Sequence, residues 1–437
     1  MNNHRLLTGL LGMVLSGVAV CSYCQSVMTL EELFEYAEIH SVQLKPAFTS
    51  QDVSQHEIRI ARTQRLPDIN ANLSVSFLGD GFTTARNYSD YQKAPIPHLG
   101  TGLGISIEQP LYTGGAITGA IEIAELKSVG ARFATDLQRD NIRFQLTGFY
   151  LDIFKYRNLR NVVEHNLEAA NRVLGDMKAR FEQGTALQND ITRYELLISN
   201  LELQLVRIDN TLNIFNNNLV TISGLPEGTV IIPDSTIVSR VLPSATEAEW
   251  RQLAVVNSPH LMLARNHIDL SLKAEKLTRS DYLPKIGLQA GWTIDGPILV
   301  EVPPINRNLS YWWVGLGVSY NLASLYKNNK AMQKRKAETL LAQEQFESTL
   351  ENINMTVRTD YMKYLEAYEE LKTHEKSVEL AQKNYRITST RYEADMALIT
   401  DMLDAANSLL DAETSLVNSK INIIYSYYKL LFSTGMI

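Results

Sequence analysis

Two aspartates three residues apart, Asp401 and Asp404, form the most suggestive charged pair in this sequence of 437 residues. Positions three apart lie on one face of an α-helix, so both carboxylates would project together and attract cations. The pair also fits an ordinary helix start, with Thr400 or Asp401 as the cap and Asp404 in the first turns. On spacing alone, the helix start is the better interpretation.

No motif of enzymatic chemistry accompanies this pair. The sequence has no phosphate-binding loop, no His-Glu-x-x-His and no Gly-x-Ser-x-Gly. The Gly-x-Gly-x-Gly run at 100–104 lies at the start of a predicted strand, so it does not match a nucleotide-binding fingerprint. His260 and His267 are seven residues apart and lack acidic partners at metal-ligand spacing. We therefore expect no enzyme, no cofactor and no metal site.

The aspartates belong to a stretch that occurs twice. Residues 180–206 and 391–417 align at a constant offset of 211, with eight identities in 27 positions. The copies differ at the second aspartate, because Arg193 stands in the first copy where Asp404 stands in the second. Each copy separates two helical patterns, so we interpret it as the tip of a helical hairpin, present once per half of a duplicated protein. The identical pairs are Arg180/Arg391, Glu182/Glu393, Ala186/Ala397, Leu187/Leu398, Asp190/Asp401, Glu202/Glu413, Leu205/Leu416 and Val206/Val417.

Very long helices must position these tips. No proline occurs between about residues 116 and 182, and a helix of that length extends roughly 100 Å. Its apolar residues are interrupted by charged and amide side chains, which is typical of helices packed side by side around a wet interior. Further helices are predicted over about 29–65 with an interruption at Pro46, and over 187–222, 246–256, 259–281, 326–395 and 398–432.

Four segments instead alternate with a period of two, over about 69–77, 102–108, 286–294 and 312–320. One interpretation is an ordinary antiparallel sheet packed on a core. The other is a membrane sheet, because nine or ten residues suit a tilted membrane strand, and because the polar faces are small and uncharged with aromatic flanks. Four strands cannot close on themselves, and an open edge is not stable in lipid. Two chains would give eight strands and three would give twelve.

Proline and glycine mark the junctions between strands and helices. Pro67 and Pro284 precede the first and third strands, and Pro110 is predicted to end the second. Gly114 and Gly115 precede the first long helix.

The first 24 residues predict a secretory signal. Arg5 precedes the apolar run Leu6–Val20, and small residues precede a cleavage position before Gln25. Both cysteines, Cys21 and Cys24, lie within or at the edge of this segment, so the mature chain would lack a thiol. Lipidation of one cysteine is an alternative. The formal net charge of −7, without a basic block, argues against a nucleic-acid partner.

Together these features resemble the TolC-type outer-membrane efflux channels, over residues 29–432. The resemblance implies an α+β fold in a homotrimer, in which four strands per chain form a twelve-stranded outer-membrane β-barrel continuous with a long α-helical barrel in the periplasm. It implies the exit duct of a tripartite efflux or type I secretion system, which passively conducts small molecules or polypeptide. The implied partners are a periplasmic adaptor protein, an inner-membrane transporter and outer-membrane lipid. The matching motifs are Gln109-Pro110-Leu111-Tyr112, Gly114-Gly115, Leu66-Pro67, Leu283-Pro284, Arg391-Tyr392 and Asp401-Met402-Leu403-Asp404-Ala405.

The resemblance also assigns roles at the tips. The second hairpin would be the inner one, where Asp401 and Asp404 form a periplasmic gate of six carboxylates in the trimer and Tyr392 helps to latch it. Asp395 departs from the pattern, because the first copy has Gly184 there. The tip residues expected to dock a partner are Arg180, Gly184, Ala186, Leu187, Arg391, Asp395, Ala397 and Leu398.

The predicted organisation is a signal peptide over 1–24, a first repeat over 25–224, an equatorial linker over 225–245 and a second repeat over 246–437. The alternative is a periplasmic adaptor or coiled-coil scaffold of an export system. Such a protein would have one helical hairpin flanked by soluble β-domains, and the duplicated strand pair argues against it.

Overall fold

The computed structural model describes residues 25–239, 242–243, 245–301 and 303–437. The predicted signal peptide and both cysteines lie outside these residues. The chain divides into two compact units, which are described separately. Each unit contains segments of both sequence repeats, because the longest helices run from one unit into the other. Within the described ranges, no helix is long and apolar enough to span a membrane.

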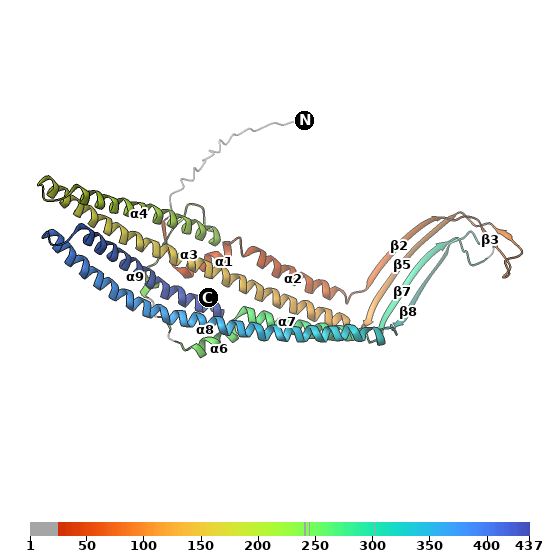
Figure 1. Cartoon of the computed structure of the whole chain (residues 1–437). Coiled ribbons are helices and arrows are strands. Elements are labelled where there is room, and N and C mark those ends of the chain that lie inside the picture. The colour runs from red at the N-terminus through yellow and green to blue at the C-terminus, as the bar shows by residue number, and fades with distance from the viewer. Residues whose placement is uncertain (1–24, 240–241, 244, 302) are drawn as a thin grey trace, which may run out of the picture. The chain divides into compact units, whose positions relative to one another are not determined.

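The first unit is built on two helical hairpins (Figure 1). It contains α1 (Leu30–His40), the part of α3 (Ala116–Glu182) from Arg143 onward, and α4 (Gln188–Ser223). It also contains α8 (Ser324–Glu393) from Leu365 and α9 (Ile399–Thr434) as far as Tyr427. Two hairpins in one chain contradict the adaptor alternative, which has one.

A short parallel strand pair in this unit was not predicted. β1 (Gln25–Met28) pairs with β6 (Val230–Pro233), which is followed by the short helix α5 (Thr236–Ser239). The buried Tyr150 of α3 connects the two segments, because its hydroxyl donates to the Met28 carbonyl at 2.8 Å and accepts from the Asp234 N–H at 2.7 Å. Part of the expected linker is therefore ordered on α3.

The second unit contains one four-stranded antiparallel sheet with the order β2-β5-β7-β8 (Figure 1). The strands from the two repeats meet at the β5–β7 pairing, where Gly104 lies opposite Thr293. The small hairpin β3–β4 lies between β2 and β5, where the sequence analysis placed no element. The bounds are β2 (Asp68–Phe77), β3 (Gly81–Thr83), β4 (Gln92–Ala94), β5 (Leu99–Tyr112), β7 (Lys285–Gly296) and β8 (Leu309–Ser319).

The sheet is not packed on a core within one protomer. All ten residues of β2 are exposed, including the apolar Leu73 (72%) and Phe77 (82%). Exposed apolar surface on this scale marks a contact with lipid or with another chain. The interpretation as an ordinary sheet over a core is therefore wrong.

The helices of the second unit are the early part of α3 and α8 and the end of α9 from Tyr428, together with α2, α6 and α7. Thr246 and Glu249 start α6 with a reciprocal capping box, and Thr29 and Glu32 start α1 with the same motif in the first repeat. In the first unit, Gly224 follows α4 and has the left-handed conformation (φ +78°), which is usual for a glycine after a helix. The remaining bounds are α2 (Lys45–Thr63), α6 (Glu247–Asn257) and α7 (Pro259–Ser280).

Candidate functional site

The two hairpin tips have the same backbone turn, although one has glycine where the other has aspartate. Gly184 (φ +76°) and Asp395 (φ +59°) both adopt the left-handed conformation just after a long helix. In each tip the next N–H donates to the carbonyl of an arginine: Thr185 to Arg180 at 2.9 Å and Met396 to Arg391 at 2.8 Å. Aspartate is among the few residues other than glycine that visit this region. The two tips therefore have the same turn, although the residue at this position differs.

Only one of the two tip arginines joins the hairpins. The Arg180 Nη2 donates to the Glu393 carbonyl at 2.9 Å, and its Nη1 lies 3.6 Å from the Asp395 carboxylate. The last carbonyls of a helix have no partner within the helix, so Arg180 of α3 caps the end of α8. Arg391 is exposed, and no ion pair or side-chain hydrogen bond of the described residues includes it.

The predicted gate residues separate into two environments. α9 begins at Ile399, so neither Thr400 nor Asp401 is its cap, as the sequence had suggested. Asp401 stabilises the helix start from within the first turn, where its carboxylate accepts from the Leu398 N–H at 3.1 Å, and Asp404 lies one turn further. Both aspartates are exposed. Tyr392 is partly buried instead, and burial followed by the nearby Asp190 raises the pKa of its hydroxyl, whereas Arg180 opposes this shift. The aspartates and Tyr392 are therefore not joined in one cluster.

An apolar cluster packs beneath the tips. It contains Met177 of α3, Ile191 and Tyr194 of α4, and Ile399 and Met402 of α9, with Tyr392 against its side. Tyr194 is only 1% exposed, and burial is the main cause that raises the pKa of its hydroxyl. The first turn of α9 is thus held to the first hairpin by its apolar face, while its aspartates face away.

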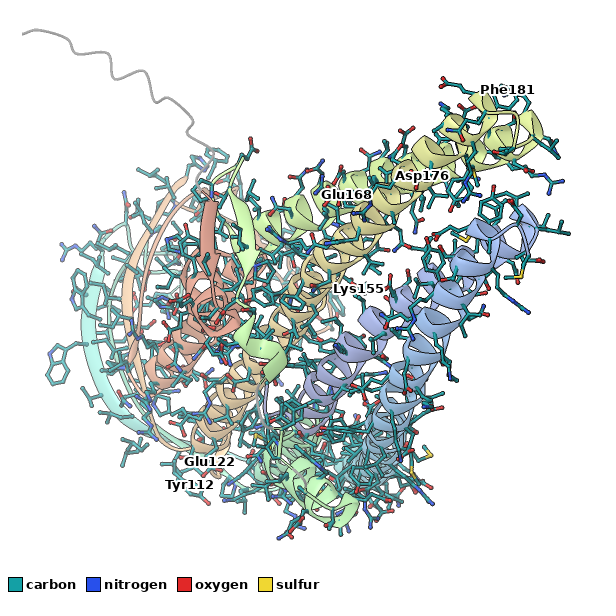
Figure 2. All side chains as sticks on the ribbon, turned by 90° about the vertical axis from the view of Figure 1, so that its left-hand side faces the viewer. Tyr112, Glu122, Lys155, Glu168, Asp176 and Phe181 are labelled. Atoms are coloured by element: carbon teal, nitrogen blue, oxygen red, sulfur yellow. The ribbon has the colours of Figure 1, made fainter. Side chains whose placement is uncertain are left out.

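The expected docking residues lie at the surface of the tips. Leu187 and Leu398 directly precede α4 and α9, and their side chains are 68% and 69% exposed. Ala186 and Ala397 are half-buried beside them. In Figure 2, Phe181 marks the tip end of α3, with Asp176 and Glu168 further back along the same helix.

The strand–helix junctions follow the predicted residues closely. Pro67 and Pro284 directly precede β2 and β7. Gly114 and Gly115 lie between β5 and α3, both with positive φ. A Cβ on Gly114 would come within 2.8 Å of the Ser280 carbonyl oxygen, so this position also needs glycine for space.

β5 is longer than the sequence predicts, since it passes through Pro110 and ends at Tyr112 after a register shift. Pro110 pairs only with Gly287 of β7, because the pairing of β5 with β2 stops at Glu108. Proline is tolerated where one side of a strand is unpaired, because the N–H that it lacks is not needed there for a hydrogen bond to a neighbouring strand.

The aspartates of α9 belong to a polar stripe that the sequence analysis missed. Every position at alternate steps of three and four residues from 401 to 422 is polar. Such steps keep side chains on one helix face. The signal that could have revealed the stripe is this regular spacing of polar residues along the predicted helix over 398–432. The polar stripe consists of Asp401, Asp404, Ser408, Asp411, Ser415, Asn418 and Asn422.

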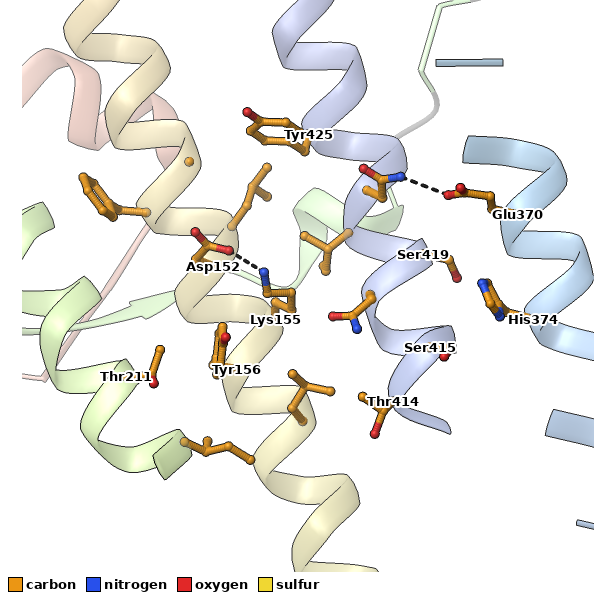
Figure 3. A pocket seen from close by; sticks show the side chains of 18 of the residues that line it. Asp152, Lys155, Tyr156, Thr211, Glu370, His374, Thr414, Ser415, Ser419 and Tyr425 are labelled. Carbon is orange, nitrogen blue, oxygen red and sulfur yellow. Dashed lines mark hydrogen bonds and ion pairs between the residues drawn. The ribbon is translucent and has the colours of Figure 1, made fainter. Parts of the chain in front are cut away.

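The far end of the polar stripe enters a concavity of about 1170 Å³ within the first unit, formed by α3, α4, α8 and α9 (Figure 3). Lys155 donates to Asp152 there at 2.6 Å, and Asn422 donates to Glu370 at 3.1 Å. Gly148 also lines it, and a Cβ at Gly148 would meet no atom within 4 Å. The surface is therefore open, and polar and apolar side chains share its lining.

The two faces of α3 differ in this region. Tyr150 binds the segments of β1 and β6, as described above, and Arg143 lies 4.0 Å from Glu38 of α1. Asp152 and Lys155 line the concavity instead (Figure 3). In this region, one face of α3 is thus covered by β1, β6 and α1, whereas the other is open and carries charged side chains.

His260 and His267 line a cavity of about 390 Å³ between α7 and α8. Burial lowers the pKa of His260. Across the part of the chain that the structure describes, no three His, Cys, Asp or Glu side chains are grouped to hold a metal ion.

Comparison with known proteins gives consistent matches over nearly the whole chain. The family described as "Outer membrane efflux protein" matches residues 33–225 and 250–435, once per repeat. Outer membrane protein TolC of Escherichia coli (strain K12) is 21% identical over 422 residues, which cover 92% of this chain and 81% of TolC. The pyoverdine export outer membrane protein OpmQ of Pseudomonas aeruginosa is 21% identical over 387 residues, covering 86% of this chain and 78% of OpmQ.

A solved outer membrane protein has a similar fold. The outer membrane protein VceC of Vibrio cholerae superposes with a TM-score of 0.76 at 17% identity, covering 93% of this chain and 96% of VceC. The combination of long helices, one four-stranded sheet and two repeated halves is therefore the TolC-like fold.

Proposed function

Because the chain belongs to the family of outer membrane efflux proteins, which are channels of the outer membrane with a periplasmic extension, we propose how its parts form the duct. Three copies close one duct, as in the homotrimers of TolC-type channels. β2 and β8 are the free edges of each sheet, and joining them between neighbours satisfies the edges that lipid would otherwise leave unpaired. Twelve strands leave a lumen, whereas eight are filled by side chains.

The open face of the first unit, which carries the polar stripe of α9, lines this duct. The observation that carries the assignment is the polar stripe, which connects Asp401 and Asp404 at the tip with the concavity through one face of α9. A wall with a covered side and a hydrophilic side suits passive conduction of polar cargo, and its unspecific chemistry leaves cargo selection to a pump.

Asp401 and Asp404 form the periplasmic gate, and Tyr392 holds the second tip against the first hairpin. The exposed position of both carboxylates and the packing of Tyr392 support this division of labour. Three copies bring six carboxylates together, and the resulting field attracts multivalent cations. The Asp401 hydrogen bond to Leu398 adds a structural role to one of the two.

The tips also dock the other parts of a tripartite system. Their exposed leucines, Leu187 and Leu398, offer small apolar anchors to a periplasmic adaptor protein. Through this adaptor, the duct connects to an inner-membrane transporter that supplies the energy. The two repeats, over 25–224 and 246–437, each contribute one tip, with 225–245 as the linker after removal of a signal peptide over 1–24.

Conductance in planar bilayers tests the gate. The double variant Asp401→Asn/Asp404→Asn should raise conductance and weaken block by a trivalent cation about tenfold or more, because six charges leave the aperture. The matched control is Glu195→Gln/Glu202→Gln, which removes the same charge from exposed positions of α4. Conductance and block equal to those of the unmodified channel, in a double variant that still runs as a heat-labile trimer, would refute the gate.

A further inference from the structure

An apolar cavity in the second unit serves none of the roles above. It has a volume of about 650 Å³ and lies between α3, α6, α7 and α8. This volume is within the range of small-molecule sites. Leu126, Val129, Leu261 and Met262 contribute to its lining. Val129 remains 39% exposed, so apolar side-chain surface in the cavity is left in contact with water.

Two of the helices that line the cavity, α3 and α7, approach each other closely at Asn266. The amide of Asn266, which is 5% exposed, donates to the Leu126 carbonyl at 3.1 Å. A Cβ on Gly130 would come within 2.8 Å of the Asn266 Oδ1, so a larger residue there would displace this buried, hydrogen-bonded amide. The cavity is thus fixed by packing and by a satisfied buried amide.

Two exposed arginines, Arg132 and Arg265, are among the residues that line the cavity. Arg132 lies 5.4 Å from the ring centre of Phe133, and Arg265 lies 5.9 Å from that of Phe346. Among the described residues, neither arginine forms an ion pair with a carboxylate. One acidic residue, Asp269, also lines the cavity, so cationic groups exceed anionic ones.

We propose that this cavity binds a free fatty acid. The alkyl chain occupies the apolar lining between α3, α7 and α8, and the carboxylate lies between Arg132 and Arg265 as a charge-assisted hydrogen-bond acceptor. Charge complementarity identifies this occupant, because a neutral or cationic amphiphile would leave both guanidinium groups without an anionic partner. The site is separate from the tip hairpins and does not depend on the gate.

Displacement of a fluorescent fatty acid tests the proposal. The full-length trimer is held in amphipol, since free detergent would compete, and bound dansyl-undecanoate is displaced by dodecanoate. Arg132→Gln/Arg265→Gln should weaken dodecanoate binding about tenfold for each arginine removed. Arg132→Lys/Arg265→Lys keeps the charge and should stay within about threefold. Arg279→Gln, on α7 but outside the cavity, is the matched control and should bind normally.

Further variants and probes decide between occupants. Val129→Trp fills the cavity and leaves both arginines in place, so it should abolish binding. Equal displacement by dodecyltrimethylammonium or dodecyl maltoside would show a merely apolar cavity and overturn the proposal. If the unmodified trimer did not bind dodecanoate, the proposal would also be overturned. Coverage of the cavity by a second copy of the chain would then explain the result. Undiminished binding of dodecanoate by Arg132→Gln/Arg265→Gln would likewise overturn the proposal.

Discussion

At the scale of single residues, the two tips form a natural comparison of glycine and aspartate in one backbone conformation. A Cβ at Gly184 would meet no atom within 4 Å, so its only conflict is conformational. Gly184→Ala should therefore destabilise the first tip by about 1 kcal/mol. Asp395→Gly should stabilise the second tip by up to about 1 kcal/mol, since the same strain is removed.

Hydrogen exchange of the tip amides measures both effects, because the exchange rates report local opening of the tips. The global unfolding transition of a large assembly does not resolve the stability of such a small region. Asp395→Asn is the control that keeps a residue able to adopt positive φ. A change of the same sign in Gly184→Ala and Asp395→Gly would contradict this account of the turn.

Tyr194 gives the tips a dependence on alkaline pH. Burial raises the pKa of its hydroxyl in the folded protein above the ordinary value of about 10 that it has when unfolded. The unfolded chain therefore releases this proton first, so the stabilisation is complete below pH ~10 and is lost as the pH rises further. Tyr194→Phe should flatten the decline of thermal stability above about pH 10, followed by circular dichroism. An equally steep decline in the variant would assign the effect to other groups.

At the scale of elements, a side chain from one hairpin caps a helix of the other. Arg180→Gln should raise exchange in the last turn of α8, because the Glu393 carbonyl loses its guanidinium partner. Arg391→Gln is the internal control, since it removes the equivalent arginine of the second copy, which is exposed and for which no such contact is found among the described residues. Similar exchange in both variants would show that Arg180 does not fasten the tips.

Long elements could be predicted closely, and short ones could not. The absence of proline and the terminal glycines predict a helix over 116–182, and α3 has these bounds. β1 and β6 have four residues each, too few for a periodic signal, and their position depends on the Tyr150 hydroxyl from a distant helix. The hairpin β3–β4 was missed for the same reason of length.

The candidate site was only partly predictable. Duplication identifies the tips, because equivalent residues can be aligned, and it directs attention to Asp401 and Asp404. The contact of Arg180 with the other hairpin has no local signal, since the partners are 213 residues apart. The concavity has none either, because it requires four helices to be brought together.

At the scale of the whole molecule, closure of the duct predicts a specific neighbour for each sheet edge. In the four-stranded sheet, β2 and β8 are the end strands, and alternation of direction makes β8 of one copy antiparallel to β2 of the next. Asn72→Cys combined in turn with Gly315→Cys, Gly317→Cys or Ser319→Cys should give covalent trimers under oxidation for at least one pair. Non-reducing gels detect them, and the single-cysteine variants are the controls. Covalent species limited to dimers at full oxidation would contradict three-fold closure.

The polar stripe of α9 also constrains how the length of this helix can change. Its repeat averages 3.5 residues, whereas a straight helix has 3.6 per turn and drifts by about 20° in each heptad. The stripe therefore keeps to one side only if α9 coils slightly to the left around its neighbours. Inserting one residue between Asp404 and Ser415 would rotate everything beyond it by about 100°, and Asn418 and Asn422 would leave the stripe. Seven inserted residues would leave it nearly in place, so the distance from tip to concavity can grow smoothly only in steps of two turns.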